Sequence, residues 1–173
     1  MWPHKITPEE YHQMGPAFPD ARLELIEGEL FDMSPIGTAH FWTVAQLTNT
    51  LVVELHGKAF TVCQSPLSLP HSEPEPDVMV LKLANYRQRL PQPADVLLLI
   101  EVADSSVNYD RTRKLPLYAR YGVPEVWLID LNARKAEVHR QPAVDHYQQV
   151  TTPKTLTPRA FPELTLALED LLP

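Results

Sequence analysis

The stretch Leu97–Ser106, LLLIEVADSS, places a single acid, Glu101, at the end of an apolar run that begins at Val96. The run is short and rich in β-forming residues, so it predicts a strand that is buried on both faces. A carboxylate at the end of such a strand is costly to bury unless a partner compensates it. Glu101 is therefore the first candidate for a functional residue.

Two partners for Glu101 stand on either side of it in the chain. Asp77 follows a proline in EPEPDVMVL, at the start of a second apolar strand, and Lys114 lies on the predicted helix after Glu101. If the two strands are neighbours, both carboxylates can bind one hard cation, and the backbone carbonyl of Val102 adds a third oxygen. Magnesium prefers oxygen ligands, and manganese suits the same set. The pattern predicts a Mg²⁺ site, with Mn²⁺ as a substitute.

An Asp, Glu and Lys around one cation suit the hydrolysis of a phosphodiester. The metal would activate water and offset negative charge, and Lys114 would orient the water or stabilise the developing charge. Each residue also has a structural interpretation. Asp77 fits a turn before a strand, Glu101 fits a buried salt bridge, and Lys114 fits a solvated helix position paired with Asp110. Only the presence of all three residues favours a catalytic interpretation over these structural ones.

Two further residues are weaker candidates for the same site. Glu24 falls on an early strand and would project toward the metal, although a solvent-facing strand position explains it equally well. His40 opens a long predicted helix and would contact phosphate or water, or it is a surface histidine near a helix start. Basic side chains before and after Glu101 would follow phosphates, or form a solvated surface. The basic residues are Arg87, Arg89, Arg111, Arg113 and Arg120.

Composition limits the class of protein. The 173 residues predict one domain over 1–173, and a net charge of −7 argues against a general, charge-driven nucleic-acid binder. The single cysteine, Cys63, excludes an intramolecular disulfide, and its apolar context predicts a core position. The longest apolar run is well short of the roughly 18 residues of a membrane span. We therefore expect a cytoplasmic protein without a membrane partner.

The pattern of apolar residues predicts an α/β order. A short helix begins at Thr7-Pro8 and ends before Gly15, residues 22–33 form two strands or one bulged strand, and a long helix spans 40 to about 56. Strands follow at Asp77 and before Glu101, then a helix over 110–121, a third buried strand EVWLID and a closing hairpin. The tail LTLALEDLL fits either a helical turn or a packed strand.

Four segments of the chain resemble a known family. ELIEGELFDMSPIGTAH, EPEPDVMVL, LLLIEVADSS and YDRTRKLPLYARYGVPEVWLID are similar to the Uma-two family of restriction endonucleases, within the PD-(D/E)XK nuclease superfamily. The likeness spans most of residues 7–140. It implies a restriction-endonuclease-like αβββαβ core with a mixed β-sheet flanked by helices, here with an extra N-terminal helix and hairpin. In the superfamily motif, Pro76-Asp77 matches the proline and first acid, and Glu101 matches the second.

The chain departs from the superfamily pattern at the lysine. That lysine normally stands two residues after the second acid, where this chain has Ala103. In the Uma-two relatives it comes from the following helix, which here offers Lys114. A helix packed beside the strand can return the ammonium to the same place. The resemblance therefore implies Asp77, Glu101 and Lys114 as catalytic residues.

Two classes of function follow from the sequence. The first is a Mg²⁺-dependent endonuclease acting on DNA, for which a twofold homodimer is attractive because cutting both strands usually needs two active sites. The second is a non-catalytic structural or interaction protein that keeps the nuclease fold. A weaker third class is a metal-dependent hydrolase of another phosphate ester. Binding of Mg²⁺ at Asp77 and Glu101 distinguishes the non-catalytic class from the other two.

Overall fold

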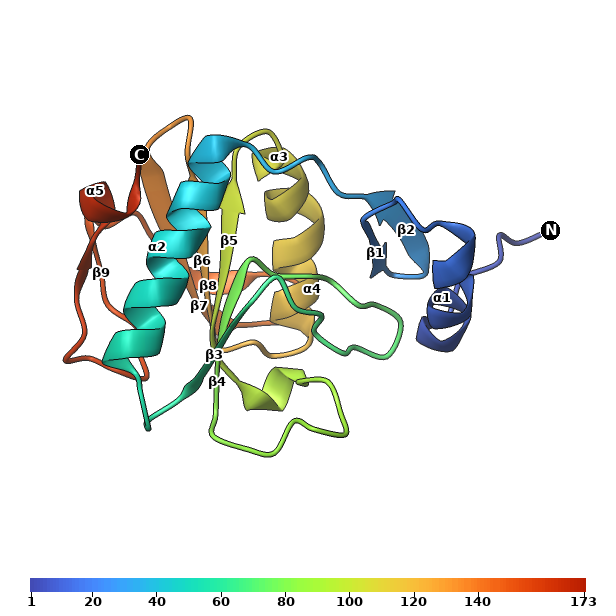
Figure 1. The fold of residues 1–173 in the computed structure, drawn as a ribbon, viewed down its shortest axis with the longest axis horizontal. Helices are drawn as coiled ribbons and strands as arrows, with labels where there is room; N and C mark the ends of the chain where they lie inside the picture. Colours follow the sequence, from blue (N-terminus) through green and yellow to red (C-terminus); the bar gives the residue numbers. More distant parts are fainter.

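A computed structural model describes residues 1–173, with every side chain except that of Pro16. Its centre is a six-stranded sheet in the order β3-β4-β5-β6-β7-β8 (Figure 1). The strands are β3 (Phe60–Cys63), β4 (Val78–Leu81), β5 (Val96–Ala103), β6 (Glu125–Asp130), β7 (Lys135–Pro142) and β8 (Tyr147–Thr151). Only β5 and β6 are parallel, so the sheet is mixed, as predicted. A short 3-10 turn, η2 (Pro93–Asp95), precedes β5.

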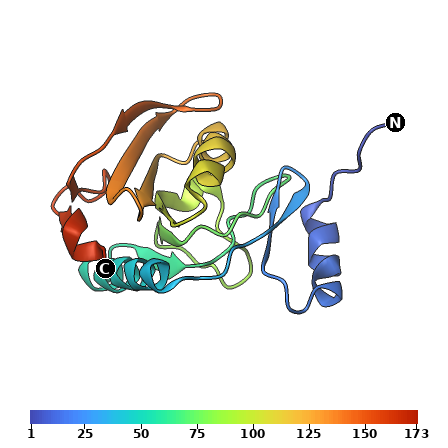
Figure 2. The ribbon, with the colours of Figure 1, turned by 90° about the horizontal axis from the view of Figure 1, so that it is seen from above.

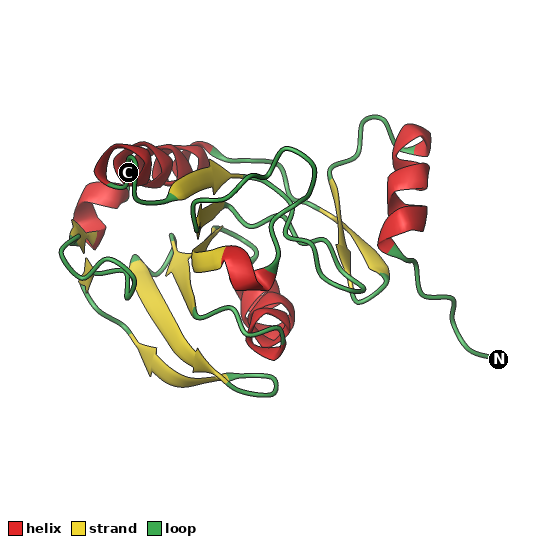
Figure 3. Ribbon diagram, turned by 90° about the horizontal axis from the view of Figure 1, so that it is seen from below, coloured by secondary structure: helices red, strands yellow, loops and turns green.

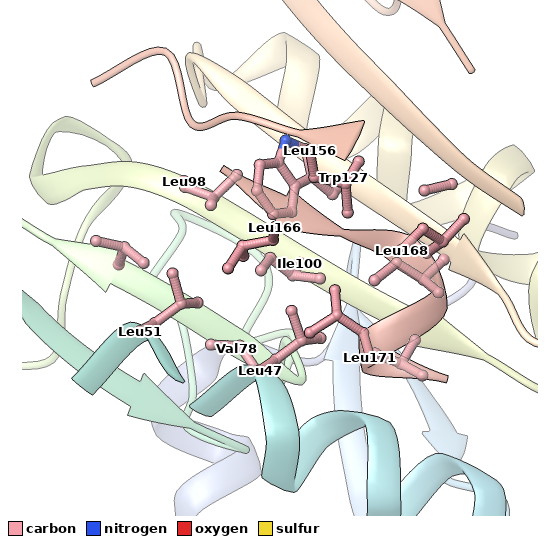
Figure 4. Packing of buried hydrophobic residues seen from close by; sticks show 14 of the residues in the cluster. Leu47, Leu51, Val78, Leu98, Ile100, Trp127, Leu156, Leu166, Leu168 and Leu171 are labelled. Carbon is pink, nitrogen blue, oxygen red and sulfur yellow. The ribbon is translucent and has the colours of Figure 1, made fainter. Parts of the chain in front are cut away.

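The long helix α2 (Thr38–Glu54) covers one face of the sheet (Figures 1 and 3). Leu47 and Leu51 on α2 point into an apolar cluster with Ile100 of β5 and Trp127 of β6 (Figure 4). The C-terminal segment closes the same cluster with β9 (Thr155–Leu156), β10 (Leu166–Ala167) and α5 (Leu168–Leu171). The tail thus contains both a strand and a helical turn, the two alternatives that its sequence allowed.

A broken helix covers the opposite face of the sheet. It runs through α3 (Val107–Tyr109), the π-helical turn η3 (Asp110–Lys114) and α4 (Leu115–Arg120). It therefore begins three residues before the predicted helix and ends one residue earlier. Pro116 has no N–H to donate to the preceding turn, which favours a wider turn just before it. Gly122, with φ of 76°, then ends the helix in a left-handed conformation. Together, α2, β3, β4, β5, this helix and β6 form the αβββαβ order.

An N-terminal arm, residues 8–32, projects from the sheet domain (Figure 2). It contains α1 (Pro8–Met14), η1 (Gly15–Ala17) and the antiparallel hairpin β1 (Leu23–Ile26) and β2 (Glu29–Asp32). The helix α1 begins with a capping box, in which Thr7 and Glu10 each accept a backbone N–H from the other. A β-bridge between Leu25 and Glu73 ties the hairpin to the loop before β4.

Two smaller features complete the description. Cys63 is exposed at the end of the edge strand β3, so its predicted core position is wrong. Across the part of the chain that the structure describes, no helix combines the length and the apolar character that crossing a membrane requires.

Candidate active site

The antiparallel pairing of β4 with β5 brings the two predicted acids together. Val78 pairs with Ile100, so Asp77 and Glu101 are the next opposing positions in the same register. Opposing residues of an antiparallel pair lie on the same face of the sheet. The condition that the two strands be neighbours is therefore met, and both acids lie at one end of the sheet.

The backbone of Val102 faces Asp77. Its N–H donates to Asp77 Oδ2 over 2.8 Å, in place of a strand-to-strand hydrogen bond. In an extended strand the N–H and C=O of one residue point the same way, so the Val102 carbonyl is also directed to the Asp77 side. The Val102 carbonyl oxygen, predicted as a metal ligand, thus lies on the side of β5 that faces Asp77.

Lys114 enters the same place from η3. Its Nζ lies 3.0 Å from Glu101 Oε1 and 3.2 Å from Glu24 Oε2. The residue is only 4% exposed, so the alternative of a solvated helix position is wrong. Burial alone would lower the pKa of Lys114, but the carboxylates of Glu101 and Glu24 outweigh it and hold that pKa well above its ordinary value. Lys114 is therefore a fixed positive charge.

The two weaker candidates also lie in this site. Glu24 on β1 is buried rather than solvent-facing, and it accepts the backbone N–H of Glu75 over 3.3 Å in addition to its ion pair with Lys114. His40, in the first turn of α2, has Nε2 3.0 Å from Asp77 Oδ1. The hydrogen bond to Asp77 raises the pKa of His40 despite its partial burial. His40 therefore orients Asp77, and Glu24 positions Lys114.

Sequence reasoning missed two side chains on the broken helix. The hydroxyl of Tyr118, which is fully buried, donates to Glu101 Oε1 over 2.5 Å. Asp110 is also buried and accepts the hydroxyl of Ser106 over 2.6 Å. Ser106, Asp110, Lys114 and Tyr118 recur every four residues, and this spacing was the available signal.

The buried acids carry more negative charge than the site neutralises. Burial raises the pKa of Glu101 to about 8, with the carboxylates of Asp110 and Asp77 adding to the effect and the Lys114 ammonium opposing it. Burial likewise raises the pKa of Asp110. Four carboxyl groups, those of Glu24, Asp77, Glu101 and Asp110, surround one ammonium group. The site gains stability from protonation or from an additional cation.

All of these groups except Tyr118 border one cavity of about 330 Å³ between the arm and the sheet domain. Its walls include Asp77, Glu101, Val102, Lys114, Glu24 and His40, which are all of the site residues predicted from the sequence. Tyr118 does not border the cavity but contacts Glu101 from the interior of the protein. The cavity therefore presents carboxylate oxygens and one ammonium to whatever enters it.

The donor set suits a hard cation, although the ligands are not gathered in the present arrangement. Among the described residues, no three His, Cys, Asp or Glu side chains converge closely enough to hold an ion. Two carboxylates and a carbonyl are nevertheless the oxygen donors that Mg²⁺ uses with several waters. Tyr118 and Lys114 both contact the same carboxylate oxygen of Glu101, Oε1.

The predicted basic strip is mostly neutralised by acids from distant parts of the chain. Arg113 contacts Glu29 over 3.0 Å and Arg120 contacts Glu27, both on the hairpin. On the other side of the helix, Arg111 contacts Glu137 of β7 over 2.7 Å. The folded helix therefore does not present a row of unpaired arginines to phosphates.

Comparisons with known proteins agree with this architecture. A crystal structure of a putative nuclease belonging to DUF820, from Anabaena variabilis ATCC 29413, superposes with a TM-score of 0.75 and 17% identity, over 96% of this chain and 97% of that one. No curated protein matches the chain. The model of the Uma-two family (Uma2), described as "Putative restriction endonuclease", matches residues 8–169. The chain thus belongs to the Uma-two family.

Proposed function

We propose that this protein is a Mg²⁺-dependent endonuclease that hydrolyses DNA phosphodiesters in the cavity between the arm and the sheet domain. The observation that carries the proposal is the buried Lys114 ammonium, held between Glu24 and Glu101 beside Asp77. Family membership and the nuclease-like fold support the same class of reaction.

The residues of the site divide into three roles. Asp77, Glu101 and the carbonyl of Val102 would hold the cation. A bound Mg²⁺ supplies positive charge that lowers the pKa of water and offsets the charge of the phosphodiester. Lys114 remains protonated and stabilises negative charge on the phosphoryl oxygens as water attacks phosphorus and the P–O bond to the leaving oxygen breaks.

The other side chains place these groups. His40 donates to Asp77 from α2 and fixes the orientation of its carboxylate. Glu24 holds the Lys114 ammonium in place through a second ion pair. The metal ligands would come together on cation binding, but neither of these two contacts requires the metal, so Asp77 and Lys114 are held in place beforehand. Such preorganisation is the main source of electrostatic catalysis.

The test is cleavage of DNA by purified protein with Mg²⁺ or Mn²⁺, with and without a chelator. We expect metal-dependent cleavage and a melting temperature that rises with millimolar Mg²⁺. Asp77→Ala should lose both, whereas Asp170→Ala, which removes an exposed acid on α5, should keep both. A protein that binds Mg²⁺ but cuts no DNA of any form would point to hydrolysis of another phosphate ester, whereas a protein that binds no Mg²⁺ would favour the non-catalytic alternative.

A further inference from the structure

We infer that the cavity accepts DNA as an unpaired, flexible strand and not as a continuous duplex. The inference rests on the proposed nuclease function and specifies its substrate class. Three observations lead to it: the depth of the reacting groups, the lining of the cavity wall, and the scarcity of open positive charge around it.

The reacting groups lie too deep for a phosphate of duplex DNA to reach them. Asp77, Glu101 and Lys114 are at most 9% exposed, and the cavity above them holds about 330 Å³. That volume is near the lower end of the range for small-molecule pockets, about 300–1,000 Å³, so it suits one nucleotide. Duplex DNA has a persistence length of about 150 base pairs, so one of its phosphates cannot move far out of the line of the backbone to enter a narrow cavity. An unpaired strand bends freely at each phosphate.

The wall of the cavity offers apolar and aromatic surface to a base. Phe31 of the hairpin and Tyr109 of the broken helix both border the cavity, with ring centroids 5.2 Å apart. Ile36, which is 44% exposed, continues this surface on the segment between the arm and α2. In a duplex the faces of the bases are already stacked, whereas in a single strand they are open to such side chains.

Open positive charge near the cavity is scarce. Arg22 borders the cavity, is exposed, and has no ion pair within the described part of the chain. The arginines of the broken helix are instead paired with Glu27, Glu29 and Glu137. Duplex binding depends on several phosphate contacts, each of which adds to the salt dependence. One open arginine on a chain of net charge −7 suits a short contact with a single strand.

The cleavage test compares one sequence in three forms: single strand, perfect duplex, and duplex with an internal unpaired bubble. With Mg²⁺, we expect the single strand and the bubble to be cut about 10- to 100-fold faster than the duplex. This factor corresponds to an unpairing cost of about 1.4–2.8 kcal/mol. Cutting confined to the bubble would locate the preference in the unpaired segment. A duplex cut as fast as the single strand overturns the inference and leaves the proposed nuclease function intact.

Binding decides the substrate class even if no cleavage is seen. Asp77→Asn, which retains a side chain of similar shape, is titrated with labelled single strand and duplex in fluorescence anisotropy. We expect the single strand to bind at least about tenfold more tightly, with a small salt slope. Equal or tighter binding of the duplex counts against the inference. Failure of every DNA form to bind or to be cut contradicts the proposed function itself.

Matched variants locate the contacts. Arg22→Gln should weaken single-strand binding and reduce the salt slope by about 0.7, the value for one phosphate, whereas Arg87→Gln should change neither. Ile36→Ala should weaken single-strand binding, whereas Phe41→Ala, which removes a more exposed apolar side chain outside the cavity, should not. Loss of binding in the two control variants alone would place the strand elsewhere. A site that takes one strand at a time also needs no twofold partner.

Discussion

Buried and exposed ion pairs join the same hairpin to the same broken helix. Glu24 of β1 meets Lys114 over 3.2 Å with both side chains 5% exposed. Glu29 of β2 meets Arg113 over 3.0 Å, but there the side chains are 49% and 44% exposed. Similar charges and distances therefore stand in different dielectric surroundings. Exposed pairs contribute little to stability, whereas a buried charge that loses its partner is strongly destabilising.

The difference indicates what each set is for. Hydrophobic side chains of similar volume would stabilise the protein as well as a buried ion pair, or better. Stability alone therefore gives no reason to bury Lys114 among four carboxyl groups. A chemical role gives one, because charge acts more strongly among buried groups than at the surface. The exposed pairs need no such explanation, and they hold the hairpin beside the helix.

Removal of the central ammonium should have the largest effect. Lys114→Ala is expected to reduce cleavage about 100- to 1,000-fold. Because Lys114 is buried, the same change should destabilise the metal-free fold by about 3–5 kcal/mol, through the unpaired carboxylates it leaves. Single-turnover cleavage and urea unfolding measure the two effects. Arg113→Ala on the same helix is the control, and equal losses in both variants would remove the distinction between buried and exposed pairs.

The second prediction concerns pH. Glu101 has an ordinary pKa of 4.5 when unfolded and a pKa of about 8 in the folded protein, chiefly because it is buried. The folded state then holds the proton more tightly, so the contribution of Glu101 to metal-free stability is complete below about pH 4.5 and is lost as pH rises through about 8. Urea unfolding between these values should show this decline. Glu101→Gln should flatten it, and Asp145→Asn, in an exposed turn, should leave it unchanged.

The third prediction separates two buried tyrosines. The hydroxyl of Tyr118 donates to the Glu101 carboxylate, and that of Tyr147 donates to the backbone carbonyl of Val123 over 2.9 Å. Hydrogen bonds to charged groups contribute about 1.5–3 kcal/mol, and neutral ones about 0.5–1.5 kcal/mol. Above about pH 8, where Glu101 is ionised, Tyr118→Phe should therefore destabilise more than Tyr147→Phe. It alone should weaken Mg²⁺ binding, measured by calorimetry, and unchanged Mg²⁺ affinity would argue against Glu101 as a ligand.

The smallest effect is expected at the surface. A double-mutant cycle on Arg113 and Glu29 should give a coupling energy of at most about 1 kcal/mol. Because both side chains are exposed, the coupling should shrink further as salt is added. Denaturant unfolding at two ionic strengths measures it. A coupling of several kcal/mol that resists salt would make the exposed pair equivalent to the buried one.

Much of the sheet and the strand positions of Asp77 and Glu101 were readable from local patterns. The apolar run before Glu101 and the proline before Asp77 predicted two buried strands, and the resemblance supplied the order of helices and strands along the chain. The convergence of His40 and Glu24 on this place could not be derived, because each had an equally good surface interpretation. Only tertiary contacts across tens of residues decide between burial and exposure.

The misreadings share a physical cause. Asp110 and Lys114 look like an ordinary surface pair four residues apart, and only the packing of the helix against β5 and the hairpin buries both. The glutamates that neutralise Arg113 and Arg120 lie more than eighty residues away in the chain. Charge pairing over such separations leaves no local signature. Sequence patterns therefore predicted the members of the site better than they predicted its surroundings.

The π-helical turn from Asp110 to Lys114 works as a phase shift. In an uninterrupted α-helix, Asp110 and Tyr118 would be rotated by about 80° from one another, because eight residues exceed two full turns. The wider turn absorbs most of that angle, and both side chains reach the interior of the protein. One extra residue thus lets a single helix direct polar side chains into the site before the turn and apolar side chains into the core after it. Gain or loss of that residue is a one-codon event, so the polar row can be engaged or disengaged during evolution while the core beneath α4 keeps its packing.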